Sequence, residues 1–523
     1  MAPKTIASPS HQVSDMNKVD AHTTYTRRDF LQKVGLTGAG YLTVGATGAK
    51  GSASTGRPNI IVILADDLGY GSLNCYGGQH LKTPACDRLA REGRRFTNAY
   101  APGSVCSPTR YGIMTGRYIW RTHVNDGFGL GDADPLLIEH DRITLGSLAK
   151  SKGYTTAAIG KWHIGLGVPT TVPKNLRWDK PLTPGPLTVG FDYFFGIAAN
   201  VMNQPDAYIE GDYLVDRIPG QHVTIEGKGK DAHTVGISPL RKPDQVMEML
   251  TDKAVAWIEE NKSDPFFLYF APNAVHDPIT PSAKYHDSPL GKYGDFIQEL
   301  DGSVQRILDL LDKHHLTDNT LIIFTSDNGG VVEPDATEQM FAHKAGLAIN
   351  GPLRGGKHSI WEGGFREPFI VRWPGKVPAG TVSDDIVCLT DILATMAGIM
   401  DAKLPDQGAE DSLDVGPSWF GDEGANPPRD FVILHAPQGC TYAVRKGPWK
   451  MIENENRPEP NMTDAAVIKS ITLWRKNKPP HDQLFNVVDD PAETRDVAAD
   501  HPDIVNALRQ ILSDARKKNR TRS

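Results

Sequence analysis

Short continuous runs of apolar residues are the clearest pattern along the chain. Each run is hydrophobic throughout instead of alternating with polar residues, which is typical of parallel strands whose two faces are both covered by helices. Four runs predict strands of this kind: Asn59–Ala65, Thr155–Ile159, Phe266–Phe270 and Leu321–Thr325.

Amphipathic stretches lie between the apolar runs and predict helices, because their apolar residues recur with the helical period. The main ones are Asp87–Gly93, Ile143–Lys152, Gln245–Lys262 and Ile297–Lys313. Strands that alternate with helices indicate an α/β protein, in which a sheet lies between layers of helices. We therefore predict an α/β fold with a large sheet flanked by helices.

The pattern changes after Gly421, where the segments become shorter and are separated by glycine-bearing turns. A Gly/Asp/Pro-rich stretch at residues 421–428 predicts a domain boundary there. We therefore predict a main domain at residues 56–425 and a smaller α+β subdomain at residues 426–523. The elements predicted in this subdomain are the strands Asp430–His435, Thr441–Arg445 and Pro448–Ile452 and the closing helix Pro502–Lys517.

The N-terminal segment has the features of an export signal. Thr26-Arg27-Arg28-Asp29-Phe30-Leu31 precedes a weakly apolar run, Val34–Ala49, which is rich in Gly, Ala and Thr. Paired arginines before a mild apolar run are typical of twin-arginine signals, although a chance pair beside a leader gives the same pattern. We predict that residues 1–55 are a signal and leader. The Tat translocase would then export the protein to a bacterial periplasm or to the medium.

Composition and charge exclude some classes of partner. The formal net charge is -7 and no long basic stripe is present, so we expect no nucleic acid partner. No stretch is long and apolar enough to span a bilayer, and we expect no stable membrane anchor. Five cysteines are too few for a disulfide framework. Cys75 and Cys86 could pair in an oxidising compartment, and the sequence leaves this open.

Polar residues follow each of the four predicted strands. In open parallel sheets, ligands bind beyond the carboxyl ends of the strands, so these side chains are candidates for a shared site. They are Asp66 and Asp67, then Lys161 and His163, then His276, and finally Asp327 and Asn328. The carboxylate and amide oxygens among them suit calcium or magnesium. Taken alone, Asp66-Asp67 could equally form a turn and a helix cap.

Cys106 is the remaining candidate for chemistry. Pro108 suits the first turn of a helix, which places Cys106 at or just before its N-terminus, where backbone N–H groups favour an anion. Arg110 lies one turn further along the same helix. A thiol in this position is expected to have a lowered pKa and to be reactive. A cysteine beside an oxygen-ligated metal is nevertheless unexplained, because calcium is a poor partner for sulfur.

A family resemblance removes this difficulty. Cys106-Ser107-Pro108-Thr109-Arg110, followed by Met114-Thr115-Gly116-Arg117, resembles the signature of the type I sulfatases. Further matches follow in the family's order at residues 58–71, 160–163, 325–329, 351–357, 445–450 and 484–486. The resemblance implies an alkaline-phosphatase-like fold with a large mixed sheet. Within the family it is similar to arylsulfatase A and N-acetylgalactosamine-6-sulfatase, and residues 183–219 are similar to relatives that act on galactosamine 6-sulfate-type sugars.

In that family a formylglycine-generating enzyme oxidises the cysteine of Cys-x-Pro-x-Arg to an aldehyde, whose hydrate is the nucleophile. The resemblance therefore implies that an oxygen at position 106, rather than sulfur, faces a calcium ion. The implied metal ligands are Asp66, Asp67, Asp327, Asn328 and the modified Cys106.

The resemblance also implies roles for the other residues. Asp327 helps to deprotonate the nucleophile, and His163 is the base that removes the second hydroxyl proton. His276 and Lys357 bind sulfate and protonate the leaving oxygen, while Lys161 and Arg110 neutralise the sulfuryl oxygens. Asn200 and His435 are candidate substrate contacts. Without the resemblance, His163 would equally suit a core position, His276 a loop, and Lys357 a solvated site.

The predicted function is the hydrolysis of sulfate esters, with a sulfated carbohydrate as natural substrate and aryl sulfates as surrogates. A formylglycine-dependent phosphonate monoester or phosphodiester hydrolase is the alternative, because its tetrahedral anion resembles sulfate. Phosphatases that share the fold typically carry Ser or Thr as nucleophile, whereas position 106 is Cys. A different class is an unmodified, inactive chain that binds sulfated glycans.

Overall fold

The computed structural model describes residues 56–124, 130, 134–167, 178–227, 232–422, 427–437, 441–454 and 479–522. The predicted signal and leader at residues 1–55 lie outside this part of the chain. Within the described ranges, no helix is both long and apolar enough to cross a membrane.

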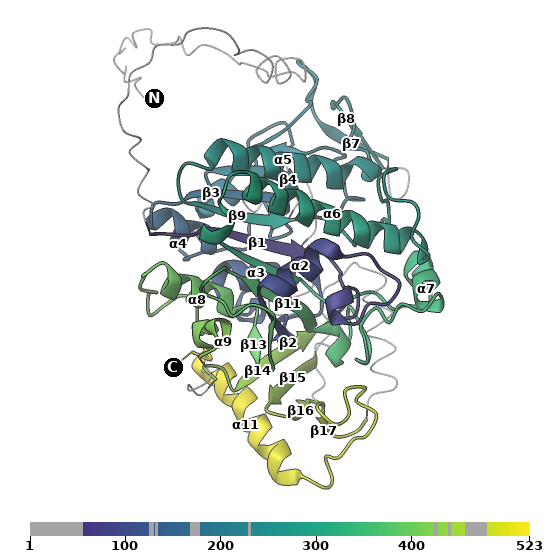
Figure 1. Ribbon diagram of the computed structural model, residues 1–523, viewed down its shortest axis with the longest axis vertical. Helices are drawn as coiled ribbons and strands as arrows, with labels where there is room; N and C mark the ends of the chain where they lie inside the picture. Colours follow the sequence, from purple (N-terminus) through teal and green to yellow (C-terminus); the bar gives the residue numbers. More distant parts are fainter. Residues whose placement is uncertain are drawn as a thin grey trace, which may run out of the picture. The chain divides into compact units, whose positions relative to one another are not determined.

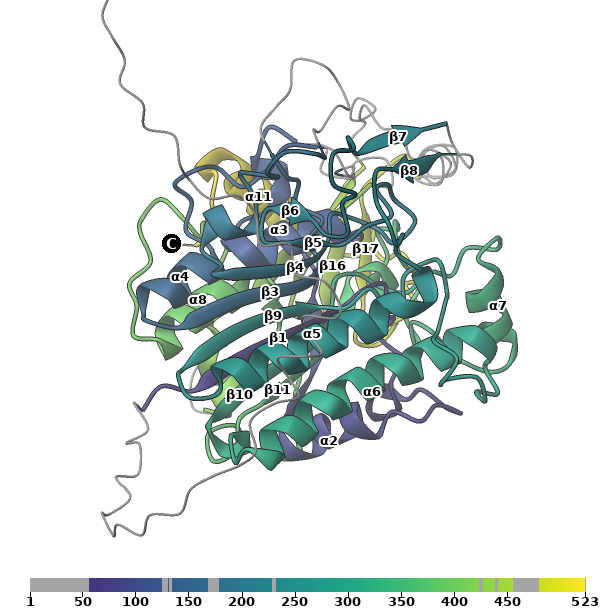
Figure 2. The same cartoon turned by 90° about the horizontal axis from the view of Figure 1, so that it is seen from above.

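A large mixed sheet forms the centre of the main domain (Figures 1 and 2). Its strands follow the order β12-β2-β11-β10-β1-β9-β3-β4-β5-β6, and β13 pairs with β2. The bounds are β1 Asn59–Ala65, β2 Arg94–Tyr100, β3 Thr155–Lys161, β4 Tyr193–Ile197, β5 Ile209–Glu210, β6 Tyr213–Leu214, β9 Phe266–Ala271, β10 Thr320–Ser326, β11 Arg366–Arg372, β12 Thr381–Ser383 and β13 Val387–Cys388. A separate hairpin pairs β7 Thr224–Glu226 with β8 His233–Val235.

The four predicted strands are the parallel centre of this sheet. β10, β1, β9 and β3 are neighbours in that order, and each pair is parallel. Their carboxyl ends therefore lie along one edge. The sequence pattern did not indicate β2 and β11, which pair antiparallel with each other. Charged and polar residues such as Arg94, Arg95 and Asn98 interrupt the apolar run of β2, so its pattern does not look like that of a buried strand.

Helices cover both faces of the sheet (Figure 2). One face carries α2 Pro84–Glu92, α5 Val246–Asn261 and α6 Gly291–Lys313, and the other carries α3 Cys106–Thr115, α4 Leu145–Ser151 and α8 Asp391–Ile399. The side chains of β1 alternate between these two layers, because Ile61 and Ile63 pack with the first set and Ile60 and Val62 with the second. α7 Thr337–Lys344 contacts α6, and α9 Gly416–Phe420 follows α8.

A small antiparallel sheet follows the main domain. It contains β14 Phe431–Ala436, β15 Thr441–Lys446, β16 Trp449–Ile452 and β17 Gln483–Asn486, in that order, and α11 Pro502–Lys518 packs against it. Its apolar residues form one core with Tyr100, Trp361 and Phe365 of the main domain. The predicted strands and closing helix agree with these elements. The predicted boundary stays a prediction, because residues 423–426 lie outside the described ranges.

Candidate active site

The carboxyl ends of the four parallel strands bring the predicted polar residues together. Ala65 of β1 lies opposite Ser326 of β10, so Asp66 and Asp327 follow their strands at the same level. The Asp327 N–H donates to the Ala65 carbonyl at 3.1 Å, which fixes this edge of the sheet. Asp66 joins the segment after β9, because its N–H donates to the Ala274 carbonyl at 2.9 Å.

Four of the five predicted metal ligands, all except Cys106, form a buried cluster. The Asp67 N–H donates to Asp327 Oδ1 at 3.1 Å, and Asn328 Nδ2 donates to Asp67 Oδ1 at 2.8 Å. All four residues, Asp66 included, are at most 2% exposed. Asn328 Oδ1 is buried and has no hydrogen-bond partner among the described residues. An unpaired buried oxygen is costly, so this atom is suited to a cation.

Cys106 is the first residue of α3, as the position of Pro108 predicts. Its Sγ lies 3.5 Å from Asp66 Oδ1 and 3.3 Å from Lys161 Nζ. The predicted lowering of the thiol pKa is wrong. Burial raises the pKa of Cys106 to about 12, and the attraction of Lys161 and Lys357 does not offset it. The unmodified side chain is therefore a protonated thiol at neutral pH and a weak nucleophile.

Three cationic side chains balance the three carboxylates. Lys161 Nζ donates to both carboxylate oxygens of Asp66 at 3.0 and 2.8 Å. Lys357 Nζ donates to Asp67 Oδ2 at 2.8 Å. Arg110 donates twice to Asp327 Oδ2, at 3.0 and 2.7 Å, in addition to the Lys161 carbonyl. Most donors of Arg110 are thus used inside the protein, which makes it a support for Asp327.

Burial and neighbouring charges shift the carboxyl pKa values in opposite directions. Burial opposes ionisation of Asp66, yet the charges of Lys161, Arg110 and Lys357 hold its pKa well below the ordinary value. Burial and the negative charge of Asp66 raise the pKa of Asp327 to about 7. Neighbouring carboxyls whose pKa values diverge in this way are typical of acid–base sites.

The two histidines are both neutral around pH 7. Burial and Lys357 lower the pKa of His276 to about 4, and its Nε2 lies 3.7 Å from Asp67 Oδ2. Burial, Lys161 and Arg110 hold the pKa of His163 well below its usual value. His163 Nε2 lies 2.8 Å from the carbonyl of Leu130, which only accepts, so Nε2 carries the proton. The other nitrogen, Nδ1, is then a lone-pair acceptor with no partner among the described residues.

Comparison with known proteins identifies the family of the chain that carries this cluster. The model of the sulfatase family matches residues 58–402 of the chain. The chain belongs to the sulfatase family. An N-acetylgalactosamine-6-O-sulfatase of Bacteroides thetaiotaomicron is 35% identical over 88% of this chain and 94% of its own length. The human N-acetylgalactosamine-6-sulfatase is 32% identical over 71% of this chain and 67% of its own length.

A solved structure supports the same conclusion about the fold. It comes from work on the metabolism of multiple glycosaminoglycans by Bacteroides thetaiotaomicron, and its name carries the label 6S-sulf. The TM-score is 0.79 at 33% identity, and the match covers 88% of this chain and 99% of that chain. This sulfatase therefore has the alkaline-phosphatase-like fold that the resemblance implied, and it is an enzyme that hydrolyses sulfuric esters.

The structure places the two candidate substrate residues differently. Asn200 lines a small recess together with Asn203, Gln204 and Arg241. This recess adjoins the site, because the His163 N–H donates to the carbonyl of Ala198, which is also in its wall, at 2.9 Å. The Asn200 Oδ1 atom is buried and has no hydrogen-bond partner within the described ranges. Its role as a substrate contact stays a prediction.

His435 of this sulfatase lies behind the nucleophile. It is 1% exposed, and its ring stacks on Tyr442 with a centroid distance of 4.2 Å. Its backbone N–H donates to the Pro102 carbonyl at 3.3 Å, just ahead of Cys106. A substrate contact by His435 also stays a prediction, and the geometry shows a packing contact behind the Cys106 segment.

Two buried polar residues near the site escaped the sequence analysis. Asn273 follows β9, is 1% exposed, and neither amide atom has a partner in the described part of the chain. Its position directly after a predicted strand was a usable signal. Glu367 lies on β11 and is fully buried, and burial with Asp327 raises its pKa well above the usual value. No signal existed for Glu367, because β11 itself was not predicted.

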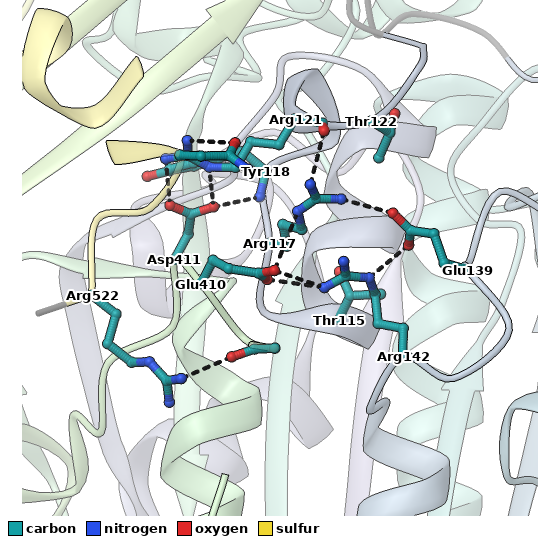
Figure 3. A network of polar contacts seen from close by, with 12 residues as sticks. Thr115, Arg117, Tyr118, Arg121, Thr122, Glu139, Arg142, Glu410, Asp411 and Arg522 are labelled. Atoms are coloured by element: carbon teal, nitrogen blue, oxygen red, sulfur yellow. Dashed lines mark hydrogen bonds and ion pairs between the residues drawn. The ribbon is translucent and has the colours of Figure 1, made fainter. Parts of the chain in front are cut away.

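The second half of the sulfatase signature has a structural task (Figure 3). α3 ends at Gly116, whose φ of +62° suits a left-handed cap. The next residue, Arg117, donates to Glu139 Oε1 at 2.8 Å and faces Glu410 at 3.7 Å. Arg142 binds both of these carboxylates. This network anchors the end of α3 that is remote from Cys106.

Cys75 and Cys86 are free thiols in this structure, so no disulfide joins them. Burial raises the pKa of Cys75 to about 12, and Cys86 is completely buried. Neither is therefore a reactive thiolate.

Proposed function

We propose that this sulfatase removes sulfate from a sulfated carbohydrate, with a formylglycine made from Cys106 and a calcium ion. The observation that carries the proposal is the position of Cys106. It begins a helix within 3.5 Å of Asp66, inside a buried cluster of three carboxylates and three cations.

The residues at the site suit calcium. Asp66, Asp67, Asp327 and Asn328 offer only oxygen, which hard divalent cations prefer. The unpartnered Asn328 Oδ1 atom is an acceptor that a cation would satisfy. Asp66, Asp67, Cys106 and His276 can also bring ligand atoms within 4.8 Å of one another, and conversion of Cys106 would replace sulfur by oxygen in this set. A bound calcium ion would withdraw charge from the sulfuryl oxygens.

The surrounding side chains suit the binding of a sulfate group. Lys161 and Lys357 currently donate to Asp66 and Asp67, so a cation that shares those carboxylates leaves both ammonium groups available to an anion. Arg110 would hold Asp327 in place and favour its ionised form. When residue 106 is formylglycine, its hydrate supplies the hydroxyl that attacks sulfur.

Proton movements follow from the tautomers. His163 Nδ1 carries a lone pair, so this atom would accept the proton of the second hydroxyl, the one that does not attack sulfur, of the hydrate at position 106. Lys357 stays protonated, because the charges of Asp67 and Asp66 raise its pKa although burial opposes this. We assign to Lys357 the protonation of the leaving oxygen of the ester, and we place His276 beside it at the sulfate site.

The relatives support a carbohydrate substrate. Both curated relatives are named for sulfated N-acetylgalactosamine, and a 6-sulfated amino sugar is therefore the first substrate to test. The wall of the recess beside the site includes three side-chain amides, those of Asn200, Asn203 and Gln204, and such groups bind sugar hydroxyl and amide groups.

The N-terminal segment supports export. Twin-arginine export moves folded proteins, so the formylglycine-generating enzyme would act on Cys106 in the cytoplasm before folding is complete. Fusion of residues 1–55 to a reporter that folds before export tests this, with Arg27→Lys and Arg28→Lys as the control. Export that survives the control would contradict the assignment.

Mass spectrometry of the peptide that contains residue 106 tests the nucleophile directly. We expect the aldehyde in active protein from a host that has the modifying enzyme, and an unmodified thiol in fully active protein would contradict it. A parallel assay compares sulfated monosaccharides with an aryl phosphate diester and an aryl phosphonate. We expect sulfate release to have the highest kcat/KM, and preferential turnover of the phosphorus esters would favour the alternative function.

A further inference from the structure

The loop that carries Lys357 connects the active site to the small sheet. This loop, residues 354–362, is here named the Lys357 loop. It closes on itself, because the Gly363 N–H donates to the Arg354 carbonyl at 2.8 Å. Its middle faces the site, since Lys357 Nζ binds Asp67 Oδ2 at 2.8 Å. The main domain also binds the middle of the loop, because the Lys357 N–H donates to the Gly330 carbonyl at 3.2 Å and the His358 N–H donates to the Ser104 carbonyl at 2.8 Å.

One residue of the C-terminal region contacts both ends of this loop. Arg354 Nη1 donates to the backbone carbonyl of Glu493 at 2.7 Å. The Glu362 N–H donates to the Glu493 side chain, at Oε2, at 2.6 Å. Glu493 lies between β17 and α11 and is completely buried. The two ends of the Lys357 loop are therefore held at one point.

Lys450 of β16 contacts both Glu493 and Glu362. Its buried Nζ lies 2.9 Å from Glu493 Oε1 and 3.2 Å from Glu362 Oε1, so it bridges the two carboxylates. Tyr100 donates to Glu362 Oε2 at 2.7 Å, and Arg366 binds the same oxygen. Because a buried charge without a partner is costly, each member of this network depends on the others.

Apolar contacts reinforce the same attachment. Trp361 meets Phe485 of β17 edge to face at 5.7 Å, and the Arg354 guanidinium lies 3.5 Å from the centre of the Trp361 ring. Ile360 and Trp361 belong to the hydrophobic core of the small sheet. Residues 360 and 361 of the loop thus belong to the small sheet's core, whereas Lys357 lies in the active site.

We propose that Glu493 and Lys450 are positioning residues for Lys357: the small C-terminal sheet holds the loop so that the Lys357 ammonium stays at the sulfate site. The inference rests on the proposed role of Lys357 in sulfate ester hydrolysis. If the network only stabilised the contact between the main domain and the small sheet, its hydrogen bonds would not need to lie at the two ends of the Lys357 loop.

A double-mutant cycle tests the proposal on the full-length, formylglycine-containing enzyme with an activated aryl sulfate, for which Lys357→Ala should retain measurable turnover. We expect Glu493→Gln and Arg354→Met each to lower kcat/KM by about tenfold, since small misplacements of catalytic groups have such effects. In the Lys357→Ala background, the same substitutions should cost less than about twofold, because the group that they position is absent.

Arg429→Gln is the matched control. Arg429 forms a buried ion pair with Asp391, at the start of α8, and does not bind Glu493, Lys450 or the Lys357 loop in the contacts of the described residues. It should lower the melting temperature and leave kcat/KM of the folded enzyme within about twofold of the wild type. This separates loss of stability from loss of positioning.

Each outcome decides the question. Equal losses for Glu493→Gln with and without Lys357 would overturn the proposal, as would unchanged kcat/KM in both single variants. If Glu493→Gln does not fold, Arg354→Met decides alone, because it leaves the Glu493–Lys450 pair intact. If Lys357→Ala alone keeps the wild-type kcat/KM, the proposed role of Lys357 itself is contradicted. This result does not depend on Glu493→Gln or Arg354→Met.

Discussion

The two ends of α3 contain the same types of side chain and behave differently. At the N-terminal end, Arg110 pairs with Asp327 beside Cys106, and all three residues are at most 4% exposed. Beyond the C-terminal end, in the short 3-10 helix Ile119–Arg121, Arg121 binds both oxygens of Asp411, at 2.7 and 2.8 Å (Figure 3). Both arginine side chains are buried and donate two hydrogen bonds to a carboxylate, Arg110 to one oxygen and Arg121 to both, so burial and pairing alone do not distinguish the two ends.

What differs is the balance of donors and acceptors. Around Arg110, the acceptors Asn328 Oδ1 and His163 Nδ1 have no partner in the described ranges, and the pKa of Asp327 is raised to about 7. Around Arg121 and Asp411, the carboxylate is also bound by the N–H of Tyr118 and the side chain of Thr521. The Asp411 carboxylate, whose two oxygens are both bound, serves as an anchor, whereas a cluster with buried acceptors left over is ready for a ligand.

The strongest test of this contrast is Cys106→Ala. Removing the nucleophile should lower kcat by at least about 10⁴-fold, because the two-step reaction then has no covalent partner. The melting temperature should change by only a few degrees, since a small side chain is exchanged for a smaller one. Sulfate release measured with an aryl sulfate checks the first part, and calorimetry checks the second. Residual turnover near the wild-type rate would remove Cys106 from the mechanism.

Removal of divalent metal is the next largest effect. Chelation should lower activity by about 10³-fold, and calcium should restore it better than magnesium. The metal-free enzyme should also melt at a lower temperature, because an ion that binds only the folded state stabilises it. Activity and melting are measured against calcium concentration. Full activity in excess chelator would contradict a calcium site at Asp66 and Asp67.

Arg110→Gln sharpens the comparison at the N-terminal end. The substitution leaves Asp327 without its bidentate partner in a buried site, so kcat/KM should fall by about 10²-fold. Calcium affinity should change as well, because Asp327 is a proposed ligand. Titration of activity with calcium measures both effects. An enzyme that loses stability but keeps kcat/KM would show that Arg110 only anchors α3.

Arg121→Gln is the matched change at the other end. Breaking this buried pair should lower the free energy of unfolding by about 3 kcal/mol. The kcat/KM of the folded enzyme should remain within about twofold, because nothing near Cys106 is altered. Denaturant unfolding and steady-state kinetics are the measurements. A large loss of kcat/KM at full folding would break the distinction between the two ends.

The pH dependence of stability should show the smallest effect. His276 has a folded-state pKa of about 4, lowered from 6.5 by burial and Lys357, so between these values the unfolded state binds more protons. Stability should therefore fall as the pH falls through this range in metal-free enzyme. Asp327, with its raised pKa, acts in the opposite direction, so the quantity to measure is the difference between the wild type and His276→Gln. Parallel curves for the two proteins would contradict the shift.

The sequence alone determined the parallel centre of the fold and the residues at its edge. Apolar runs such as Asn59–Ala65 are local signals, and a residue that directly follows such a run must lie at the strand's carboxyl end. The positions of Asp66, Lys161 and Asp327 could be predicted for this reason. The helix start at Cys106 could be predicted from Pro108, and the ordered motifs identified the family.

Only the tertiary structure decided the features that depend on contacts between distant segments. Neighbouring elements bury β2 and β11 in spite of their charged residues. Glu367 is buried because it lies on β11. The thiol pKa of Cys106 depends on how completely helices and strands exclude water, which overrides the favourable helix start. The attachment of the Lys357 loop to Glu493 joins residues far apart in the chain, and no local pattern specifies such a pair. Local periodicity reports the conformation of a segment, whereas desolvation and charge pairing depend on what the fold places around it.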